Sequence, residues 1–353
     1  MFKVTKIDDF NIFEPSEKAA SQTKPLVDSS FIKNKEFLKN FTTPRKGTMR
    51  ISGSFIYAHP PDYKGCPALN WNSEAWAELF TEMKQAGIDT VIFQAAVWHE
   101  LGEAYYKSDY FKNIYKTYPV IEAMLTAAQK INLRVFLGGY GCTIGWSKCL
   151  DKRTVNAEVS KQLHCIKELL EYRDLFEGVY FSPETAVSAN RDIAKEKFLN
   201  ELYCRYFSEL KSLSPQHKIL MSPATKHGND NGEIIIDGWS NVLNKVPLDI
   251  MAPQDSIGCA GCNLGIQQAA WDIWKKICDN SNIELWANVE LFERRSFGGP
   301  APLIPAAPER VIAQIDNIAG FVQKIICWEY PYFAGTKGSA GAELIRKRIF
   351  NID

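Results

Sequence analysis

Gly178-Val-Tyr-Phe-Ser-Pro-Glu-Thr185 is an apolar run that stops abruptly at a lone carboxylate. Residues 179–181 favour a buried strand, because β-branched and aromatic side chains pack well on a pleated sheet. Pro183 has no backbone N–H to give to a neighbouring strand and therefore helps to end this one. The side chain of Glu184 is expected at the C-terminal tip of the strand.

The same pattern returns further along the chain, where Asp255, Glu290 and Glu329 each follow an apolar run. The C-terminal tips of parallel strands meet at one face when the strands close into a barrel, and the active sites of such barrels lie on that face. Carboxylates at the tips of several strands therefore predict a single active site.

Eight apolar strands alternate with helices from residue 49 onward, at the spacing expected of a (β/α)8 barrel of about 250 residues. Short, continuous apolar runs are typical of strands that are covered on both faces. The expected strands span residues 50–57, 90–98, 134–140, 178–181, 218–225, 249–255, 283–290 and 324–330. The expected helices run from Asn72 or Ser73 to Gly87 and over residues 119–131, 155–172, 193–213, 237–245, 265–278, 308–318 and 340–350. The sequence thus predicts an α/β fold, a (β/α)8 TIM barrel with an irregular N-terminal extension.

Two regions differ in character and define the expected domain organisation. Residues 1–48 are polar with scattered aromatic residues and form the N-terminal extension, in which residues 30–41 could make a short helix. Residues 49–353 form the barrel catalytic domain. A doubly wound open sheet is the alternative fold, but no GxGxxG or GxxxxGK[ST] motif follows the first strand.

Composition and charge exclude some functions and favour a location. Lys plus Arg and Asp plus Glu both total 41, so the net charge is zero and no basic excess is present to attract nucleic acid. No run of about 18 apolar residues is present, so no membrane-spanning helix and no membrane partner are expected. The N-terminus lacks the apolar core of a secretory signal, which predicts a cytoplasmic protein. The sequence indicates no oligomeric state.

Cysteine and histidine spacing predicts neither a metal site nor a cofactor. The chain has nine cysteines, and Cys259 and Cys262 form a CxxC pair. A zinc site needs a second pair or histidines at suitable spacing, and the five histidines are scattered. Reduced thiols in a loop are the expected state of this pair.

Glu184 and Glu290 are the best candidates for a pair of catalytic carboxyl groups of the kind that cleaves glycosidic bonds. They follow strands four and seven and could face each other across the barrel mouth. Asp255 is the third candidate and could orient Glu184, hold a sugar hydroxyl, or act as acid or base. The alternatives are structural: Glu184 caps a helix, Glu290 pairs with Arg294 or Arg295, and Asp255 opens an Asx turn.

Aromatic and amide side chains at the strand tips indicate a carbohydrate ligand, because rings stack on the apolar faces of sugars and polar groups bind hydroxyls. Trp328 is preferred over its neighbour Glu329, since alternate residues of a strand face opposite sides. The substrate-binding candidates are Tyr57, His59, Gln94, Trp98, Tyr140, Gln254, Asn288 and Trp328.

Several of these segments resemble the DUF4434 group of glycoside-hydrolase-like TIM barrels over residues 50–333. The matching segments are Gly53-Ser-Phe-Ile, residues 76–94, Tyr180-Phe-Ser-Pro-Glu184, Pro253-Gln-Asp-Ser-Ile-Gly258 and Trp286-Ala-Asn-Val-Glu290. The layout is also similar to the large clan of retaining glycosidases, which implies that Glu184 is the acid/base and Glu290 the nucleophile. That clan has Asn directly before the strand-four Glu, where this chain has Pro183.

The sequence therefore predicts a glycoside hydrolase that cleaves O-glycosidic bonds of an oligosaccharide or glycoside. One alternative is a carbohydrate-binding barrel without catalytic activity. Another is a barrel enzyme of a different class, either a lyase or a metal-dependent enzyme that uses Asp255 with Glu184.

Overall fold

The structure is a computed structural model that describes residues 2–4, 13–15, 49–61, 67–142, 151–187, 191–224, 232–294 and 303–353 of the 353-residue chain. Near the N-terminus, β1 (Phe2–Val4) pairs with β2 (Phe13–Pro15) in an antiparallel ladder. The short helix expected over residues 30–41 lies outside the described residues.

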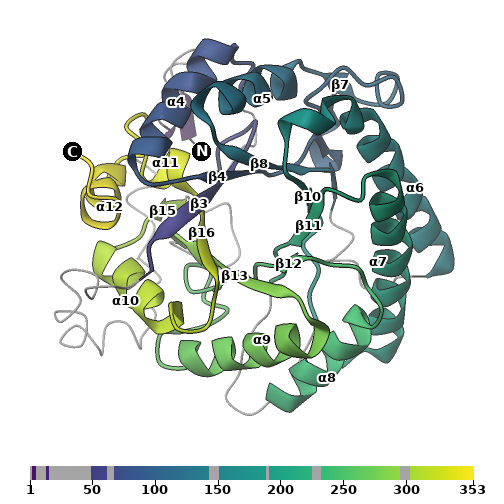
Figure 1. Cartoon of the computed structure of the whole chain (residues 1–353). Coiled ribbons are helices and arrows are strands. Elements are labelled where there is room, and N and C mark those ends of the chain that lie inside the picture. Colours follow the sequence, from purple (N-terminus) through teal and green to yellow (C-terminus); the bar gives the residue numbers. More distant parts are fainter. Residues whose placement is uncertain are drawn as a thin grey trace.

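The centre of the molecule is a closed barrel of eight parallel strands (Figure 1). The strands lie in the order β3, β4, β8, β10, β11, β12, β13 and β16, and β16 pairs with β3 to close the ring. The predicted (β/α)8 fold is confirmed. The barrel strands are β3 (Ile51–Ile56), β4 (Thr90–Phe93), β8 (Arg134–Gly138), β10 (Gly178–Phe181), β11 (Lys218–Met221), β12 (Ile250–Met251), β13 (Glu284–Glu290) and β16 (Lys324–Trp328).

A ring of helices surrounds the barrel (Figure 1), and those that precede β16 connect one barrel strand to the next. In α4 the Asn72 side chain accepts a hydrogen bond from the Ala75 N–H, and the helix buries Trp76, Phe80 and Met83. The helices are α4 (Ser73–Gln85), α5 (Val120–Ile131), α6 (Lys152–Leu169), which continues as the 3-10 turn η3 (Leu170–Leu175), α7 (Ile193–Leu213), α8 (Gly232–Leu243), α9 (Gln267–Ser281), α10 (Pro308–Ile318), α11 (Tyr330–Phe333) and α12 (Ala342–Ile349).

Side chains form two cores, one inside the barrel and one between the strands and the helices. Because strand residues alternate between faces, Tyr180 belongs to the inner core while Val179 and Phe181 belong to the outer one. The inner core fills the barrel below its C-terminal end. Its residues are Phe55, Ile92, Phe136, Tyr180, Leu220, Ile250, Ala252, Trp286 and Ile326.

Gly178 makes room for an aromatic ring in the inner core. It lies opposite Phe136 in the register of β10 and β8. A Cβ on Gly178 would lie 2.5 Å from Cε1 of Phe136 and 2.5 Å from the carbonyl oxygen of Lys218. Glycine at this position therefore lets the Phe136 ring fill the barrel at the level where β10 begins.

The main differences from the predicted elements lie beyond the C-terminal ends of the barrel strands. The strand expected over residues 90–98 is split, because the chain leaves the barrel after β4 and passes close to Gly138. A Cβ atom added to Gly138 would lie 2.4 Å from the Gln94 carbonyl oxygen. After β4 and β8 the chain builds a small sheet from β5 (Val97–Trp98), β6 (Glu103–Ala104), β7 (Lys116–Thr117) and β9 (Tyr140–Gly141), with η1 (His99–Leu101) between β5 and β6. A hairpin of β14 (Phe292–Arg294) and β15 (Leu303–Pro305) follows β13.

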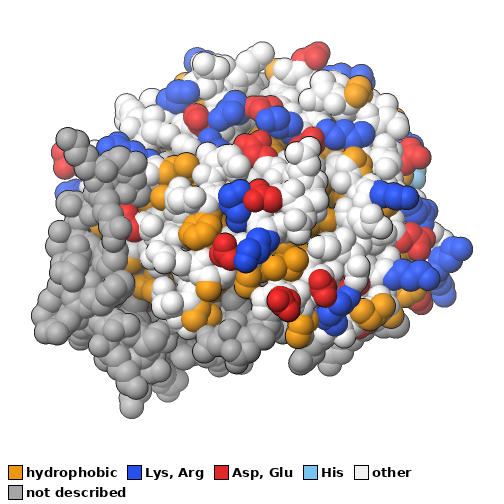
Figure 2. Space-filling model, turned by 60° about the horizontal axis from the view of Figure 1, so that its bottom comes forward, with side chains coloured by type: hydrophobic (Ala, Val, Ile, Leu, Met, Phe, Trp, Pro, Cys, Tyr) orange, Lys and Arg blue, Asp and Glu red, His pale blue; other side chains and the backbone are white. Residues whose placement is uncertain are grey.

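One face of the surface carries both signs of charge close together (Figure 2), with hydrophobic side chains between them. This distribution agrees with a formal net charge of zero. Over the described part of the chain, every helix is too short or too polar to cross a bilayer.

Replacing Gly178 with alanine tests how tightly the inner core is packed. The new methyl group would collide with a backbone carbonyl and a buried ring, neither of which moves freely. We expect the free energy of unfolding, measured by urea denaturation, to fall by about 1–3 kcal/mol. Gly320→Ala is the matched control, because no atom lies within 4 Å of its Cβ position. An equal decrease in the free energy of unfolding in the two variants would show that the inner core tolerates the methyl group.

Candidate active site

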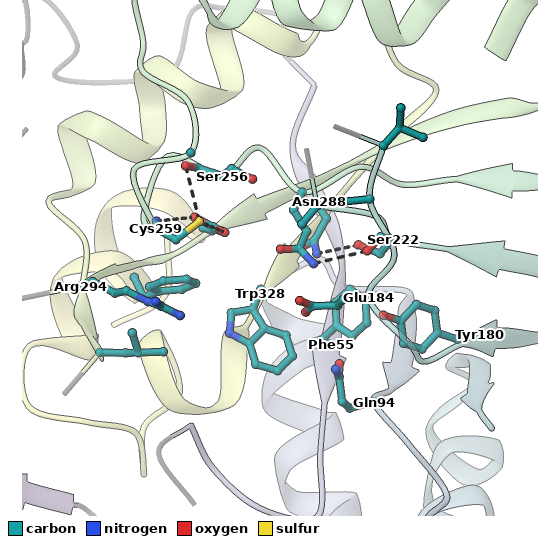
Figure 3. A pocket seen from close by; sticks show the side chains of 18 of the residues that line it. Phe55, Gln94, Tyr180, Glu184, Ser222, Ser256, Cys259, Asn288, Arg294 and Trp328 are labelled. Carbon is teal, nitrogen blue, oxygen red and sulfur yellow. Dashed lines mark hydrogen bonds between the residues drawn. The ribbon is translucent and has the colours of Figure 1, made fainter. Parts of the chain in front are cut away.

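A cavity of about 750 Å³ lies at the C-terminal ends of the barrel strands (Figure 3). Its walls come from β3, β10, β13 and β16, from the segments that follow β4, β10, β11 and β12, and from the hairpin of β14 and β15. The volume is that of a pocket for a small ligand. Of the predicted site residues, the cavity brings together Gln94, Glu184, Gln254, Asn288, Glu290 and Trp328.

Glu184 reaches the cavity because the residue after it is bonded to a helix outside the barrel. Thr185 forms a hydrogen bond with the Tyr203 hydroxyl on α7, so Glu184 turns inward next to Tyr180. The carboxylate is partly open to the cavity. Burial raises the pKa of Glu184, while a hydrogen bond with the Gln254 side chain and the positive charge of Arg294 act in the opposite direction.

Glu290 is the last residue of β13 and is 2% exposed. The Cys259 N–H donates to its Oε2 at 2.9 Å, and the Cys259 thiol lies 3.3 Å from its Oε1 (Figure 3). Burial raises the pKa of Glu290 to about 7, and the negative charge of Asp255 acts in the same direction. The two hydrogen bonds from Cys259 act against this rise.

The carboxylate of Asp255 lies behind Glu290 and does not line the cavity. Its Oδ1 accepts from the N–H of Ile257 at 3.3 Å and from the N–H of Glu290 at 3.2 Å. Its Oδ2 accepts from the Gln314 side chain on α10. The contact with Ile257 is the Asx turn that was considered as the structural alternative for this residue.

Two buried amide oxygens in the cavity wall have no hydrogen-bond donor among the residues that the structure describes. They are Oδ1 of Asn288 and Oε1 of Gln94. Asn288 is 2% exposed, and its Nδ2 donates to the Ser222 hydroxyl at 3.1 Å. Buried polar atoms in folded proteins nearly always have partners, so these two acceptors are unusual features of the cavity wall.

Aromatic rings form one side of the cavity. Trp328 lines it, and its ring centroid lies 5.6 Å from that of Phe55. The neighbouring Glu329 points away from the cavity, where it accepts hydrogen bonds from the Tyr57 hydroxyl at 3.2 Å and the Tyr332 N–H at 3.1 Å. Trp286 belongs to the inner core of the barrel beneath the cavity.

Four predicted binding residues lie outside this cavity. Tyr57 is 3% exposed and bonds to Glu329. Nε2 of His59 lies 2.6 Å from Oε2 of Glu103 in the small sheet. Tyr140 and Trp98 are part of that sheet, and the Tyr140 hydroxyl lies 3.2 Å from the Tyr115 hydroxyl.

Sequence reasoning missed several residues that line the cavity, notably Arg294, Lys195, Ser222 and Cys259. Ser222 directly follows β11, so the rule that strand tips face the site could have found it. Arg294 and Cys259 come from the segments after β13 and β12, whose paths the strand pattern does not determine.

Metal ligation has no support in the described side chains. No group of three or more His, Cys, Asp or Glu residues among them is arranged to hold a metal ion. The cavity instead combines two carboxyl groups, two unsatisfied amide oxygens, aromatic rings and the cations Arg294 and Lys195.

Solved structures of glycoside hydrolases share this fold. A "putative alpha-L-fucosidase" from Bacteroides thetaiotaomicron VPI-5482 is 21% identical, with a TM-score of 0.70, and the match covers 88% of this chain and 98% of that one. An exo-beta-1,4-mannosidase from Opitutaceae bacterium strain TAV5 is 12% identical, with a TM-score of 0.51, and covers 81% of this chain and 53% of that one. At these identities the likeness establishes the barrel fold and not the reaction.

Among curated proteins, none matches this chain. A family model does match, over residues 51–339, and its description is "Domain of unknown function (DUF4434)". This range includes all eight barrel strands and the residues that line the cavity. The chain belongs to the DUF4434 family.

Proposed function

We propose that this chain is a glycoside hydrolase that cleaves an O-glycosidic bond of an oligosaccharide or glycoside with Glu184 and Glu290. The observation that carries the proposal is that both carboxyl groups, from the tips of strands four and seven, line one cavity. Glycosidic cleavage needs two such groups, one to protonate the leaving oxygen and one to act at the anomeric carbon.

Glu184 is the proton donor in this proposal. It follows strand four, where the similar clan of retaining glycosidases has its acid/base, and it lies in one cavity with Phe55 and Trp328. Burial raises the pKa of Glu184, as it does that of Glu290, so the assignment rests on position. Glu290 acts at the anomeric carbon, directly or through a water molecule. Its two hydrogen bonds from Cys259 hold the carboxylate in one orientation.

The other cavity residues suit a polyol. Gln94 and Asn288 line the cavity, and their amide groups can pair with sugar hydroxyls. Trp328 offers a ring face for an apolar sugar face, and Gln254 adds a further amide next to Glu184. Asp255 holds the backbone of Glu290 and raises its pKa, so we assign it a positioning role in place of a direct catalytic one.

Glu184→Gln and Glu290→Gln should each lower kcat/KM by about 10²–10⁴-fold, because each removes a carboxyl group that takes part in proton transfer or attack. Release of 4-nitrophenol from a panel of 4-nitrophenyl glycosides measures the effect. Glu177→Gln is the matched control, since Glu177 directly precedes β10 and lies at the opposite end of that strand from Glu184. Wild-type activity in either site variant would contradict the proposal.

Thermal unfolding shows whether lost activity reflects lost structure. A carboxyl group whose pKa is raised in the folded state stabilises the fold below its unfolded pKa and loses that contribution as the pH rises through the folded value. For Glu290 this loss runs from about pH 4 to about pH 7. Glu290→Gln should therefore melt no lower than wild type at pH 8.

Sugar binding by a wild-type protein that hydrolyses no glycoside would favour the carbohydrate-binding barrel.

Azide rescue distinguishes the two carboxyl roles. In Glu290→Ala the missing side chain leaves space for an azide ion to attack the anomeric carbon in one displacement, so turnover should recover and yield a glycosyl azide of inverted configuration. NMR of the product measures the configuration. Glu184→Ala lacks the proton donor, so activated leaving groups should lose least activity in this variant. A reversal of the two results would exchange the assigned roles.

Asp255→Asn should move the acid limb of the pH profile of kcat/KM to lower pH. The negative charge of Asp255 raises the pKa of Glu290, so its removal lets Glu290 ionise at lower pH. We expect a shift of about one pH unit from a limb near pH 7 in the wild type. Asp272→Asn, on the exposed side of α9, is the control. An unchanged limb with reduced activity would show that Asp255 acts through structure alone.

A further inference from the structure

The cavity contains a guanidinium group that the proposed hydrolysis does not use. Arg294 is the last residue of β14, and its side chain lines the cavity from the side of the β14–β15 hairpin. Figure 3 shows it extending toward Trp328 and the carboxylate of Glu184. Its charge acts to lower the pKa of both Glu184 and Cys259, so it lies within electrostatic reach of Glu184 and of the thiol that contacts Glu290.

The backbone of Arg294 is held firmly in place. Its N–H donates to the carbonyl oxygen of Gly258 at 3.1 Å, which joins the hairpin to the loop after β12. A Cβ on Gly258 would lie 2.1 Å from the carbonyl oxygen of Phe292, so only glycine permits this close approach. Arg310 on α10 donates to that same oxygen at 2.6 Å. The start of the Arg294 side chain is therefore fixed relative to the loop that holds Glu290.

The guanidinium of Arg294 lacks an acidic partner within the described parts of the chain, where it makes no ion pair and no side-chain hydrogen bond. Arg310 differs, since its Nε lies 3.5 Å from Oε1 of Glu293 and its Nη2 donates to two carbonyl oxygens. Glu184 neutralises Arg294 only in part, because burial favours its uncharged form. Lys195, on α7, is a second cation that lines the cavity.

We propose that Arg294 binds an anionic substituent, a carboxylate or a sulfate ester, on the sugar that enters this cavity, so that the substrate is an acidic glycan. The planar guanidinium presents paired N–H donors that match the oxygens of such groups. This inference rests on the proposed function for the reaction, but the binding that it describes is independent of catalysis.

The remaining polar groups of the cavity fit the rest of such a ligand. Asn288 and Gln94 line the cavity, and their neutral amide groups suit hydroxyls, which both donate and accept hydrogen bonds. The cavity therefore offers both amide groups for hydroxyls and a cation for an anionic group. A neutral sugar would leave the guanidinium of Arg294 to solvent, whereas an acidic sugar would also pair with its charge.

Calorimetric titration of the wild-type protein with free monosaccharides tests the inference without any bond cleavage. The probes are D-glucuronate, D-galacturonate, glucose 6-sulfate and galactose 6-sulfate, each against its neutral parent sugar. We expect at least one acidic sugar to bind about 10- to 100-fold more tightly than its parent, the range for one hydrogen-bonded charge pair. Comparing the affinities of the uronates with those of the sulfated sugars shows which anion the site prefers.

Arg294→Gln should abolish this preference while leaving the affinity for the neutral parent sugar within about twofold, because glutamine keeps a hydrogen-bond donor but loses the charge. The preference should also weaken as the salt concentration rises, since the site is open to solvent. Arg205→Gln, on the exposed face of α7, is the control and should bind as wild type does.

The outcomes separate this inference from the proposed hydrolysis. A protein that prefers no acidic sugar over its parent, or an Arg294→Gln variant that keeps the preference, overturns the acidic ligand while the hydrolase activity is judged separately. Charge-dependent binding by a protein that hydrolyses none of the corresponding 4-nitrophenyl uronides or sulfated glycosides supports the anion site and rejects the hydrolase.

Discussion

The buried carboxylate of Asp255 ties the active-site face of the barrel together. It accepts hydrogen bonds from the backbone of Ile257 and of Glu290 and from the side chain of Gln314, so it joins the loop after β12, the end of β13 and α10. The backbone N–H of Asp255 also donates to the Asn288 carbonyl at 2.9 Å, which extends the β12–β13 ladder toward the mouth. A buried charge is stable only with such donors, and the donors fix the position of Glu290.

This arrangement brings two negative groups close together in a part of the protein with little water. Burial and the field of Asp255 raise the pKa of Glu290 into the neutral range, where a carboxyl group can exchange protons during a reaction. Ionising it costs free energy, which packing elsewhere must offset. The inner core supplies such packing directly below, where Tyr180, Phe136 and Trp286 fill the barrel and give the cavity an apolar floor.

The fold and part of the site could be predicted because both depend on periodicity. Apolar runs located all eight barrel strands, and alternation within a strand placed Trp328 toward the cavity and Glu329 away from it. The same rule, applied to residues 254–256, puts Gln254 and Ser256 in the cavity wall and Asp255 behind it. His59, Trp98 and Tyr140 lie outside the cavity because the chain leaves the barrel axis after β3, β4 and β8, and no strand pattern describes that path.

Arg294 and Cys259 line the cavity although the strand pattern did not predict them. Both belong to segments outside the barrel strands, whose positions depend on contacts between distant parts of the chain. The stretch 178–185 shows why strand residues are easier to place. Gly178 leaves room for the Phe136 ring, Tyr180 two residues later fills the barrel, and Glu184 reaches the cavity above it. One short strand and the residues after it thus leave room for a neighbouring ring, pack the barrel interior and bring a carboxyl group to the cavity, because a fixed rise per residue converts sequence spacing into depth along the barrel.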